Sequence, residues 1–172
     1  MLKRNNIYLR ALEPSDIMPL YHWENDPDNW KVSGTLVPYS KAILEEYLQH
    51  AHKDLYTTRQ FRFMICLAEN AKPIGTIDLF EFDPYHLRAG IGILIGNKDA
   101  RRKGHASDAL NVLCDYALTQ LNLKQLFCNI NTNNIASVGL FEKNGFEKAG
   151  TKKSWIKNQN QFEDEYFYQK VF

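Results

Sequence analysis

The sequence predicts a mixed α+β domain with a central, mostly antiparallel sheet and helices packed against it. Apolar, β-rich runs of strand length recur along the chain, and from Ser107 the apolar period lengthens from that of a strand to that of a helix. The predicted elements follow the order βαα-βββ-α-β-α-ββ. A chain of 172 residues has the size of one domain, residues 1–172, and can bury a core.

The first part of the chain predicts a strand and two helices. Residues 7–11 form the expected strand, and residues 14–16 open a helix that ends near residues 25–27. The polar stretch 24–40 contains Gly and Pro and predicts a loop, after which Ser40 is the expected N-cap of the second helix. The inner faces consist of Ile17, Leu20 and Tyr21 in the first helix and of Ile43, Tyr47 and Leu48 in the second.

The rest of the chain predicts an antiparallel meander followed by alternating helices and strands. The meander strands span 61–67, 74–82 and 86–95, with turn residues between them. A helix of about four turns starts at Ser107, and a second helix spans 135–143. The remaining predicted strands are 126–130, 146–155 and 162–171, and the inner face of the long helix consists of Ala109, Leu110, Leu113, Ala117 and Leu118.

Composition and charge exclude several function classes. Lys and Arg total 21 against 20 Asp and Glu, so the net charge of +1 predicts no general attraction to nucleic acid or to an anionic membrane. No stretch approaches the roughly 18 apolar residues of a membrane span. The three cysteines have no C-x-x-C spacing and lie in apolar segments, which favours buried thiols and a cytoplasmic location. The scattered histidines predict no metal site.

One basic stretch requires a local explanation. Arg101, Arg102 and Lys103 stand directly after an apolar strand and before a helix, with Gly104 and Ala106 keeping the loop free of bulk. A strand that leads into the N-terminus of a helix is a natural anion site, and the cations suit a diphosphate. The motifs of phosphate-binding P-loops and of dinucleotide folds are absent. A nucleotide, a dinucleotide, coenzyme A or a solvated basic turn all fit these residues.

Arg101-x-x-Gly104-x-Ala106 resembles the Q/R-x-x-G-x-G/A acetyl-coenzyme A loop of the GNAT N-acetyltransferase superfamily. The segments NIYLRALEPSDI, IGTIDLFEFDPYHLRAGIGILI and NTNNIASVGLFEKNGFEKAGTKK are similar to the ribosomal-protein-alanine and spermidine N-acetyltransferase branch. The resemblance covers nearly the whole chain. It implies a sheet of six to seven strands, splayed between the fourth and fifth, with about four flanking helices.

The resemblance also implies a coenzyme site. The backbone of Ile93, Leu94 and Ile95 would pair with the pantetheine arm, and a free N–H there would stabilise an oxyanion. Asn134 matches the family asparagine that touches the coenzyme, and a helix N-cap is its alternative role. The pyrophosphate would be held by the loop residues Arg101, Arg102, Lys103, Gly104, His105 and Ala106, and Ser137 and Phe141 would lie beside the coenzyme.

Catalysis needs a base for the amine and an acid for the departing thiolate. Glu81 matches a glutamate of spermidine acetyltransferases and is the expected base, with His86 as the second choice. A surface carboxylate is the alternative interpretation of Glu81. Many relatives have a tyrosine acid where this chain has Phe141, so Ser137 is the expected group near the thiol. Some relatives carry a glutamate base where this chain has Gly90.

The expected acceptor is a primary amine, either a polyamine such as spermidine or the N-terminal amine of a protein. Glu24, Trp30, Asp78 and Glu81 are its candidate contacts, because converging carboxylates attract a cation. The alternatives are a catalytically weak acetyl-coenzyme A-binding module and an enzyme for another amine, such as an antibiotic or an amino acid. We expect no nucleic acid, membrane or metal partner, and a homodimer or larger homo-oligomer.

Overall fold

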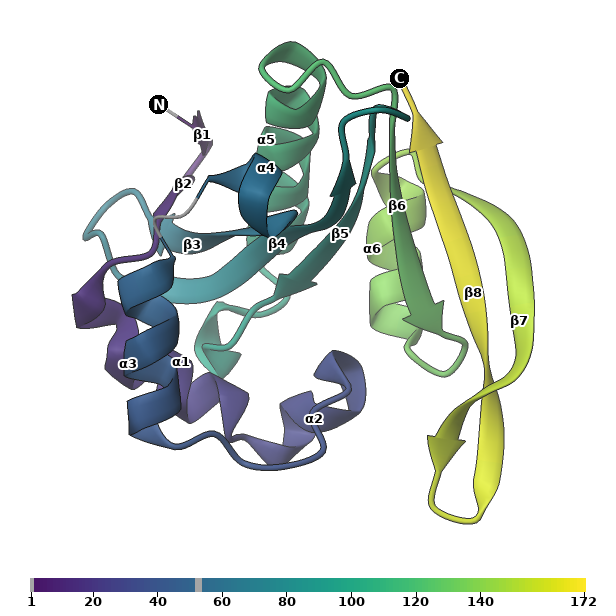
Figure 1. Cartoon of the computed structure of the whole chain (residues 1–172), viewed down its shortest axis with the longest axis horizontal. Coiled ribbons are helices and arrows are strands. Elements are labelled where there is room, and N and C mark those ends of the chain that lie inside the picture. The colour runs from purple at the N-terminus through teal and green to yellow at the C-terminus, as the bar shows by residue number, and fades with distance from the viewer. Residues whose placement is uncertain (1, 52–53) are drawn as a thin grey trace.

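The computed structural model describes residues 2–51 and 54–172, and its strands form one sheet in the order β1-β2-β3-β4-β5-β6-β8-β7 (Figure 1). All neighbouring strands are antiparallel except β5 and β6, which are parallel. The predicted mixed fold is therefore confirmed. The strands are β1 Leu2–Arg4, β2 Ile7–Ala11, β3 Phe61–Leu67, β4 Pro73–Asp83, β5 Arg88–Leu94, β6 Gln125–Asn131, β7 Glu147–Asn158 and β8 Gln161–Val171.

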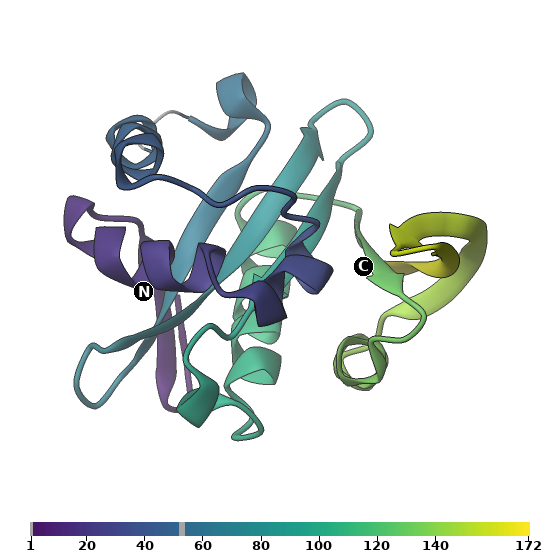
Figure 2. The same cartoon turned by 90° about the horizontal axis from the view of Figure 1, so that it is seen from below.

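Helices cover both faces of the sheet. Helices α1, α3 and α4 lie on one side, and α5 and α6 lie on the other (Figure 2). The α5 side holds the larger core, and α1 and α3 close a smaller one over β3. The helices are α1 Ile17–Glu24, α2 Pro27–Ser33, α3 Lys41–His50, α4 Leu55–Thr58, α5 His105–Thr119 and α6 Ile135–Lys143, with short 3-10 turns η1 Pro14–Asp16 and η2 Lys98–Ala100.

The sheet opens between β5 and β6. These strands pair only at Arg88–Gln125, Ala89–Leu126 and Gly90–Phe127, whereas β4 follows β5 as far as Leu94. Beyond Gly90 the two strands diverge, so the β6-facing edge of β5 has no strand partner among the described residues. This is the splay that the sequence resemblance implied, between the fourth and fifth of the seven predicted strands.

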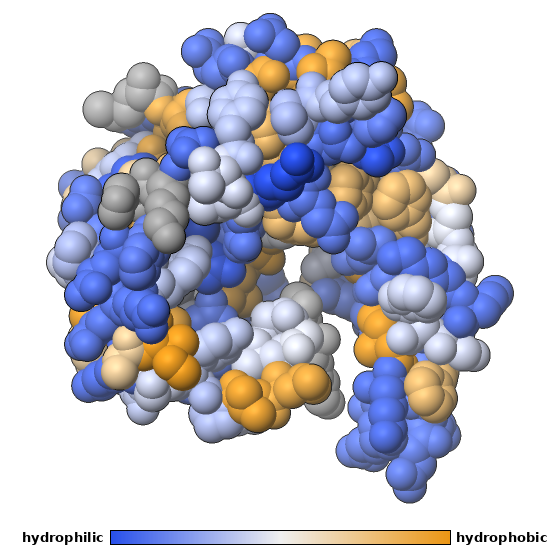
Figure 3. Space-filling model, viewed as in Figure 1, coloured by the Kyte–Doolittle hydropathy of each residue, from blue (hydrophilic) through white to orange (hydrophobic). Residues whose placement is uncertain are grey.

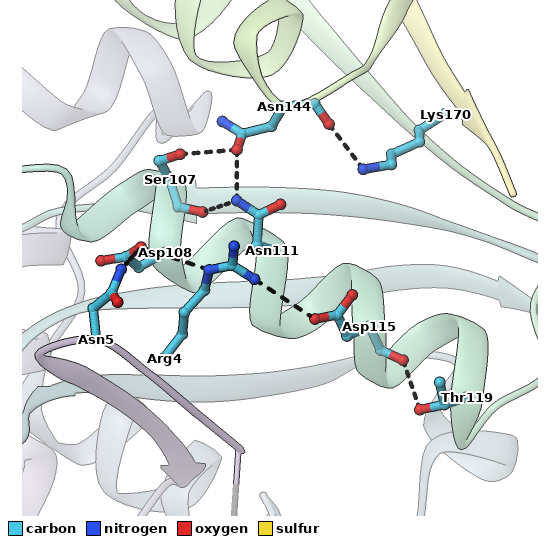
Figure 4. Close-up of polar contacts among 9 residues, drawn as sticks. All are labelled: Arg4, Asn5, Ser107, Asp108, Asn111, Asp115, Thr119, Asn144 and Lys170. Carbon is cyan, nitrogen blue, oxygen red and sulfur yellow. Dashed lines mark hydrogen bonds and ion pairs between the residues drawn. The ribbon is translucent and has the colours of Figure 1, made fainter.

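Asn144 joins the two parts of the molecule on the α5 side of the splay (Figure 4). Its Oδ1 accepts hydrogen bonds from Ser107 Oγ at 2.8 Å and Asn111 Nδ2 at 2.7 Å, both on α5. Its backbone carbonyl accepts from Lys170 Nζ on β8 at 2.8 Å. Asn144 is only 8% exposed, so these bonds satisfy a buried amide while tying α5 to the end of α6.

Several local predictions were wrong. Within 24–40, predicted as a loop, Asp26 caps α2, Pro27 occupies its first turn and Gly34 ends it in the left-handed region at φ 70°. The described residues form eight strands and six helices, where six to seven strands and about four helices were expected. The short elements β1 and α4 were not predicted because they have too few residues to show a period. On α3 it is Leu44, and not Ile43, that packs inward with Leu48, and on α5 Leu118 is 44% exposed. Compared with the predictions, the buried face of α3 is shifted by one position and that of α5 is narrower by one residue, because tertiary packing determines which side chains are buried.

Candidate functional site

The basic loop leads from η2 into the N-terminus of α5. Gly104 precedes the helix at φ 85°, in the left-handed region, and a Cβ added there would meet no heavy atom within 4 Å. No side chain caps this helix in the described residues. The unpaired N–H groups and the open space above Gly104 fit the oxygens of a diphosphate.

The three cations of the loop differ in their surroundings. Arg101 donates from Nε to the carbonyl oxygen of Ile95 at 2.8 Å and from Nη2 to Asn29 Oδ1 at 3.1 Å. The side chains of Arg102 and Lys103 are exposed and make no hydrogen bond or ion pair with residues 2–51 or 54–172. Arg101 is therefore already occupied within the chain, and Arg102 and Lys103 are the cations available to an anion.

His105 and Ala106 form the first turn of α5 beside this open space. The Nδ1 atom of His105 is buried, and it has no hydrogen-bond partner within the described part of the chain. A buried nitrogen without a partner is costly, which is a further reason to expect a polar ligand here.

The segment that connects β5 to the loop is bound to α1 and α2. The indole of Trp23 covers Gly96, where a Cβ would lie 2.3 Å from the ring. Lys98 Nζ lies 3.1 Å from Asp26 and 2.7 Å from Asp28. The pKa of Asp26 is lowered by the backbone N–H of Asp28 and by Lys98. The loop that would carry the coenzyme phosphates is thus fixed to the N-terminal helices.

Across the splay, α6 begins at Asn134. Its side chain accepts a 3.1 Å hydrogen bond from the backbone N–H of Ser137, so the N-cap role is present. Ser137 is partly buried in the first turn of α6. Phe141 is only 4% exposed, and its ring packs edge-on against Phe146 at 5.0 Å. Phe141 is therefore a core side chain, whereas Asn134 and Ser137 are only partly buried.

The family model described as "Acetyltransferase (GNAT) domain" matches residues 6–147. The chain belongs to the GNAT acetyltransferase family. The chain is 28% identical over 168 residues to the "Uncharacterized N-acetyltransferase p20" of Bacillus licheniformis, covering 97% of this chain and 93% of that one. It is 28% identical to a spermidine N(1)-acetyltransferase of Vibrio cholerae, over 85% of this chain and 82% of that one.

Among solved structures, the chain is similar to a spermidine N-acetyltransferase from Vibrio cholerae in complex with CoA and spermine. The TM-score is 0.88 at 25% identity, over 98% of this chain and 96% of that one. These relatives establish this GNAT chain as an acetyl-transferring enzyme and confirm the expected fold.

Strand β4 contains a bulge opposite Ala89. Phe80 pairs with Gly90 and Asp83 with Arg88, so Glu81 and Phe82 together face the single residue Ala89. Glu81 adopts φ 48°, a left-handed conformation that non-glycine residues rarely take. Bulges and such strained residues are frequent beside active sites because they redirect a side chain.

Glu81 lines a groove of about 560 Å³. The groove lies at the narrow end of the splay, where β5 and β6 still pair. The molecular surface is hollowed on the face that Figure 3 shows. We call it the β4–β8 groove. Its lining consists of Arg59, Glu81, Phe82, Asp83, Arg88, Gln125, Phe127, Asn129, Lys152, Phe167 and Gln169.

The structure explains the absence of a side chain at Gly90. A Cβ there would lie 2.2 Å from the ring of Phe80, which crosses the glycine and packs edge-on against Phe127 at 5.9 Å. The aromatic ring therefore occupies the space that a side chain at position 90 would need. Glu81, the residue after Phe80, opens to the groove.

Glu24 and Asp78, two of the candidate acceptor contacts, lie close together with Arg62 between them. Its guanidinium donates to Asp78 Oδ1 at 2.6 Å and to Glu24 Oε1 at 2.8 Å. All three side chains are at most 20% exposed. One of the two negative charges is neutralised, and both carboxylates already have a cation. Trp30 is attached to the same cluster through a 2.7 Å bond from Nε1 to the carbonyl of Glu24.

His86 lies in the exposed turn between β4 and β5, with its ring edge-on to Tyr85 at 4.8 Å. It does not line the groove, so the structure separates it from Glu81. Sequence reasoning missed Arg62, Asn29 and Arg59, because a lone polar residue on a strand or turn carries no recognisable spacing. In the described residues no group of three His, Cys, Asp or Glu side chains could hold a metal. No described helix is long and apolar enough to cross a membrane.

Proposed function

We propose that this GNAT chain transfers the acetyl group of acetyl-coenzyme A directly to a primary amine, within a complex that holds both substrates. The observation that carries the proposal is the continuous path along the splay. The path begins at the uncapped N-terminus of α5 with Gly104, follows the unpaired edge of β5, and ends at the groove that contains Glu81.

Acetyl-coenzyme A would supply the acetyl group as a thioester. The backbone groups of Ile93, Leu94 and Ile95 would bind its arm as an added strand. Arg102, Lys103 and the N–H groups of His105 and Ala106 would hold its diphosphate, while Arg101 keeps the loop in place through Ile95 and Asn29.

Glu81 would accept the proton that the ammonium form of the acceptor must lose, because an alkyl amine with a pKa near 10 is charged at neutral pH. The freed amine then forms the C–N bond while the C–S bond breaks. A backbone N–H of β5 would donate to the carbonyl oxygen during this step. The nitrogen then loses its second proton, and Ser137 or water would pass that proton on to the sulfur, since Phe141 has none to give.

The acceptor classes under this proposal are a polyamine, a peptide N-terminal amine, and another small amine such as an amino acid. The similarity to spermidine N-acetyltransferases supports the first. The ion pairs of Arg62 with Glu24 and Asp78 leave one net negative charge there, which weakens the case for a polycation at that cluster. We also propose that residues 1–172 act as one domain and that the enzyme forms a homo-oligomer, in line with the dodecameric structure of a Vibrio cholerae relative. Three free buried cysteines support a cytoplasmic location.

The test is acetyl-coenzyme A turnover, measured as free thiol, with spermidine, spermine, an aminoglycoside, amino acids and peptides of varied N-terminus. Amine-dependent thiol release and an N-acetylated product by mass spectrometry would support the proposal. If the coenzyme raises the melting temperature while no amine is acetylated, the chain is a binding module and the transferase proposal fails.

A further inference from the structure

We propose that the β4–β8 groove selects a small amine that also carries a carboxylate, that is, a free amino acid. This inference rests on the proposed acetyl transfer and specifies its acceptor. It follows from the charges that the groove leaves uncompensated and from its aromatic floor.

The first step is the charge inventory of the groove. Arg88 Nη2 lies 3.3 Å from Asp83, and Lys152 Nζ lies 2.8 Å from Glu165, so these cations are paired within the chain. Neither Arg59 nor Glu81 forms an ion pair with residues 2–51 or 54–172. Within the described residues, the groove therefore presents one unpaired guanidinium and one unpaired carboxylate.

The second step is that the backbones at Arg59 and Glu81 lie side by side. The N–H of Phe82, the residue after Glu81, donates a 3.0 Å hydrogen bond to the carbonyl oxygen of Arg59. Both residues have positive φ, 55° at Arg59 and 48° at Glu81, so both depart locally from extended structure. A ligand that carries both an ammonium and a carboxylate matches a groove that both side chains line.

The third step is the ligand's remaining chemistry. Phe127 and Phe167 line the groove with ring centroids 5.7 Å apart and offer an apolar surface for a side chain. One uncompensated guanidinium balances a carboxylate of charge −1 and would leave part of a phosphate charge unpaired. A polyamine would instead bring several positive charges to a groove in which Glu81 is the lining carboxylate that has no ion pair within the described residues.

The fourth step connects the groove to the acetyl donor. Phe127 is the last β6 residue that pairs with β5, and Asn129 lies just beyond it on the same strand. A coenzyme arm that follows β5 from the basic loop reaches the groove at this point. The amine of a ligand held by Glu81 then faces the narrow end of the splay, where the thioester would arrive.

The experiment compares acceptors that differ only by the carboxylate: leucine with 3-methylbutylamine, and phenylalanine with 2-phenylethylamine, with spermidine included. We expect kcat/KM to be at least tenfold higher for each amino acid than for its decarboxylated partner. Calorimetry with leucine and 3-methylbutylamine, without an acetyl donor, should show the same preference in binding. If the amines without a carboxylate, spermidine among them, are equal or better acceptors, the inference is wrong while the transferase proposal stands. If acetyl-coenzyme A binds but no amine reacts, both are wrong.

A variant pair tests the role of Arg59. Arg59→Gln should raise KM for leucine at least tenfold with little change in kcat, and should leave 3-methylbutylamine within twofold. Lys3→Gln removes the same charge from exposed strand β1 and should change neither acceptor. Loss of activity toward both amines in Arg59→Gln, with an unaltered melting temperature, would contradict carboxylate recognition by this residue.

Discussion

The guanidinium of Arg101 donates a 3.1 Å hydrogen bond to Oδ1 of Asn29, a buried side chain 72 positions earlier in the chain. The same amide donates from Nδ2 to the carbonyl of Trp23 at 2.9 Å. The basic loop is thereby attached to α1 and α2, which also carry Glu24 and Trp30. The residue that opens the coenzyme motif supports the loop from within the chain, while its neighbours face solvent.

Arg101→Gln should therefore act mainly on stability. It removes bonds to the carbonyl of Ile95 and to buried Asn29, and we expect the free energy of unfolding to fall by about 1–3 kcal/mol. Arg102→Gln removes an equal charge with no described partner and should cost less than about 0.5 kcal/mol while weakening coenzyme binding. Urea unfolding and calorimetry with coenzyme A measure the two effects. Equal stability losses would contradict the assignment.

Gly104→Ala should weaken coenzyme binding at least tenfold. The added methyl group occupies space that is open in the free protein, and alanine at φ 85° is strained. Gly139→Ala is the matched control, because its Cβ also meets open space but lies within α6, where alanine is favoured over glycine by roughly 0.5–1 kcal/mol. Calorimetry with coenzyme A checks the difference. Unchanged affinity in Gly104→Ala would remove this loop from the site.

Glu81→Gln should lower kcat by about 10²–10⁴-fold, the usual contribution of a general base. Coenzyme affinity should not change. The defect should shrink as pH rises toward 10, because alkyl amines then lose their proton without help. A pH–rate profile tests this, with Glu69→Gln in the exposed turn before β4 as control. Parallel profiles for wild type and Glu81→Gln would exclude Glu81 as the base.

Phe141→Tyr should give no gain in rate. Position 141 is 4% exposed and packed against Phe146, so a tyrosine hydroxyl would be buried, at a cost of about 1–3 kcal/mol without a hydrogen-bond partner. The measurements are kcat and the unfolding free energy of the same preparation. A faster enzyme with undiminished stability would indicate that this position can host a catalytic acid.

The three cysteines should not react with a thiol reagent in the native state. Cys66, Cys114 and Cys128 are buried, and burial raises the pKa of Cys114 to about 11 and that of Cys128 to about 12. At pH 8 few thiolates exist to react. Native protein should therefore show no titratable thiol within minutes, and unfolded protein should show three. A native reaction would contradict the burial and would also disturb a thiol-based turnover assay.

The sequence predicted the long elements well because their burial is periodic. The bounds of β2, β3 and α6 match the predicted ranges, and the Ser40 and Asn134 caps are present. The prediction of a loop at α2 failed because the helix is short and its sequence is polar. Its start and stop signals, Asp26, Pro27 and Gly34, are equally typical of a loop. Local composition there favoured a loop, and the contacts with Lys98 and Arg101 that hold α2 come from a distant segment.

The candidate site was predictable where it depends on local backbone and unpredictable where it depends on pairing across the fold. Gly104 before a helix predicts an anion site by itself. Nothing near Arg62 in the sequence indicates that it lies between Glu24 and Asp78, and nothing near Arg59 indicates its proximity to Glu81. Charge compensation is a property of tertiary structure, and it changes the expected character of the acceptor site.

The short junction between β5 and β6 also determines how the molecule fluctuates. Residues of β6, β7 and β8 join the remaining sheet through three residue pairs, supplemented by the bonds of Asn144 to α5. Amide hydrogens of these strands should exchange through a partial opening that leaves β3 and β4 intact. A coenzyme arm that is hydrogen-bonded along the splay would supply the missing strand. Coenzyme binding would then suppress this partial opening, so that the whole sheet unfolds cooperatively.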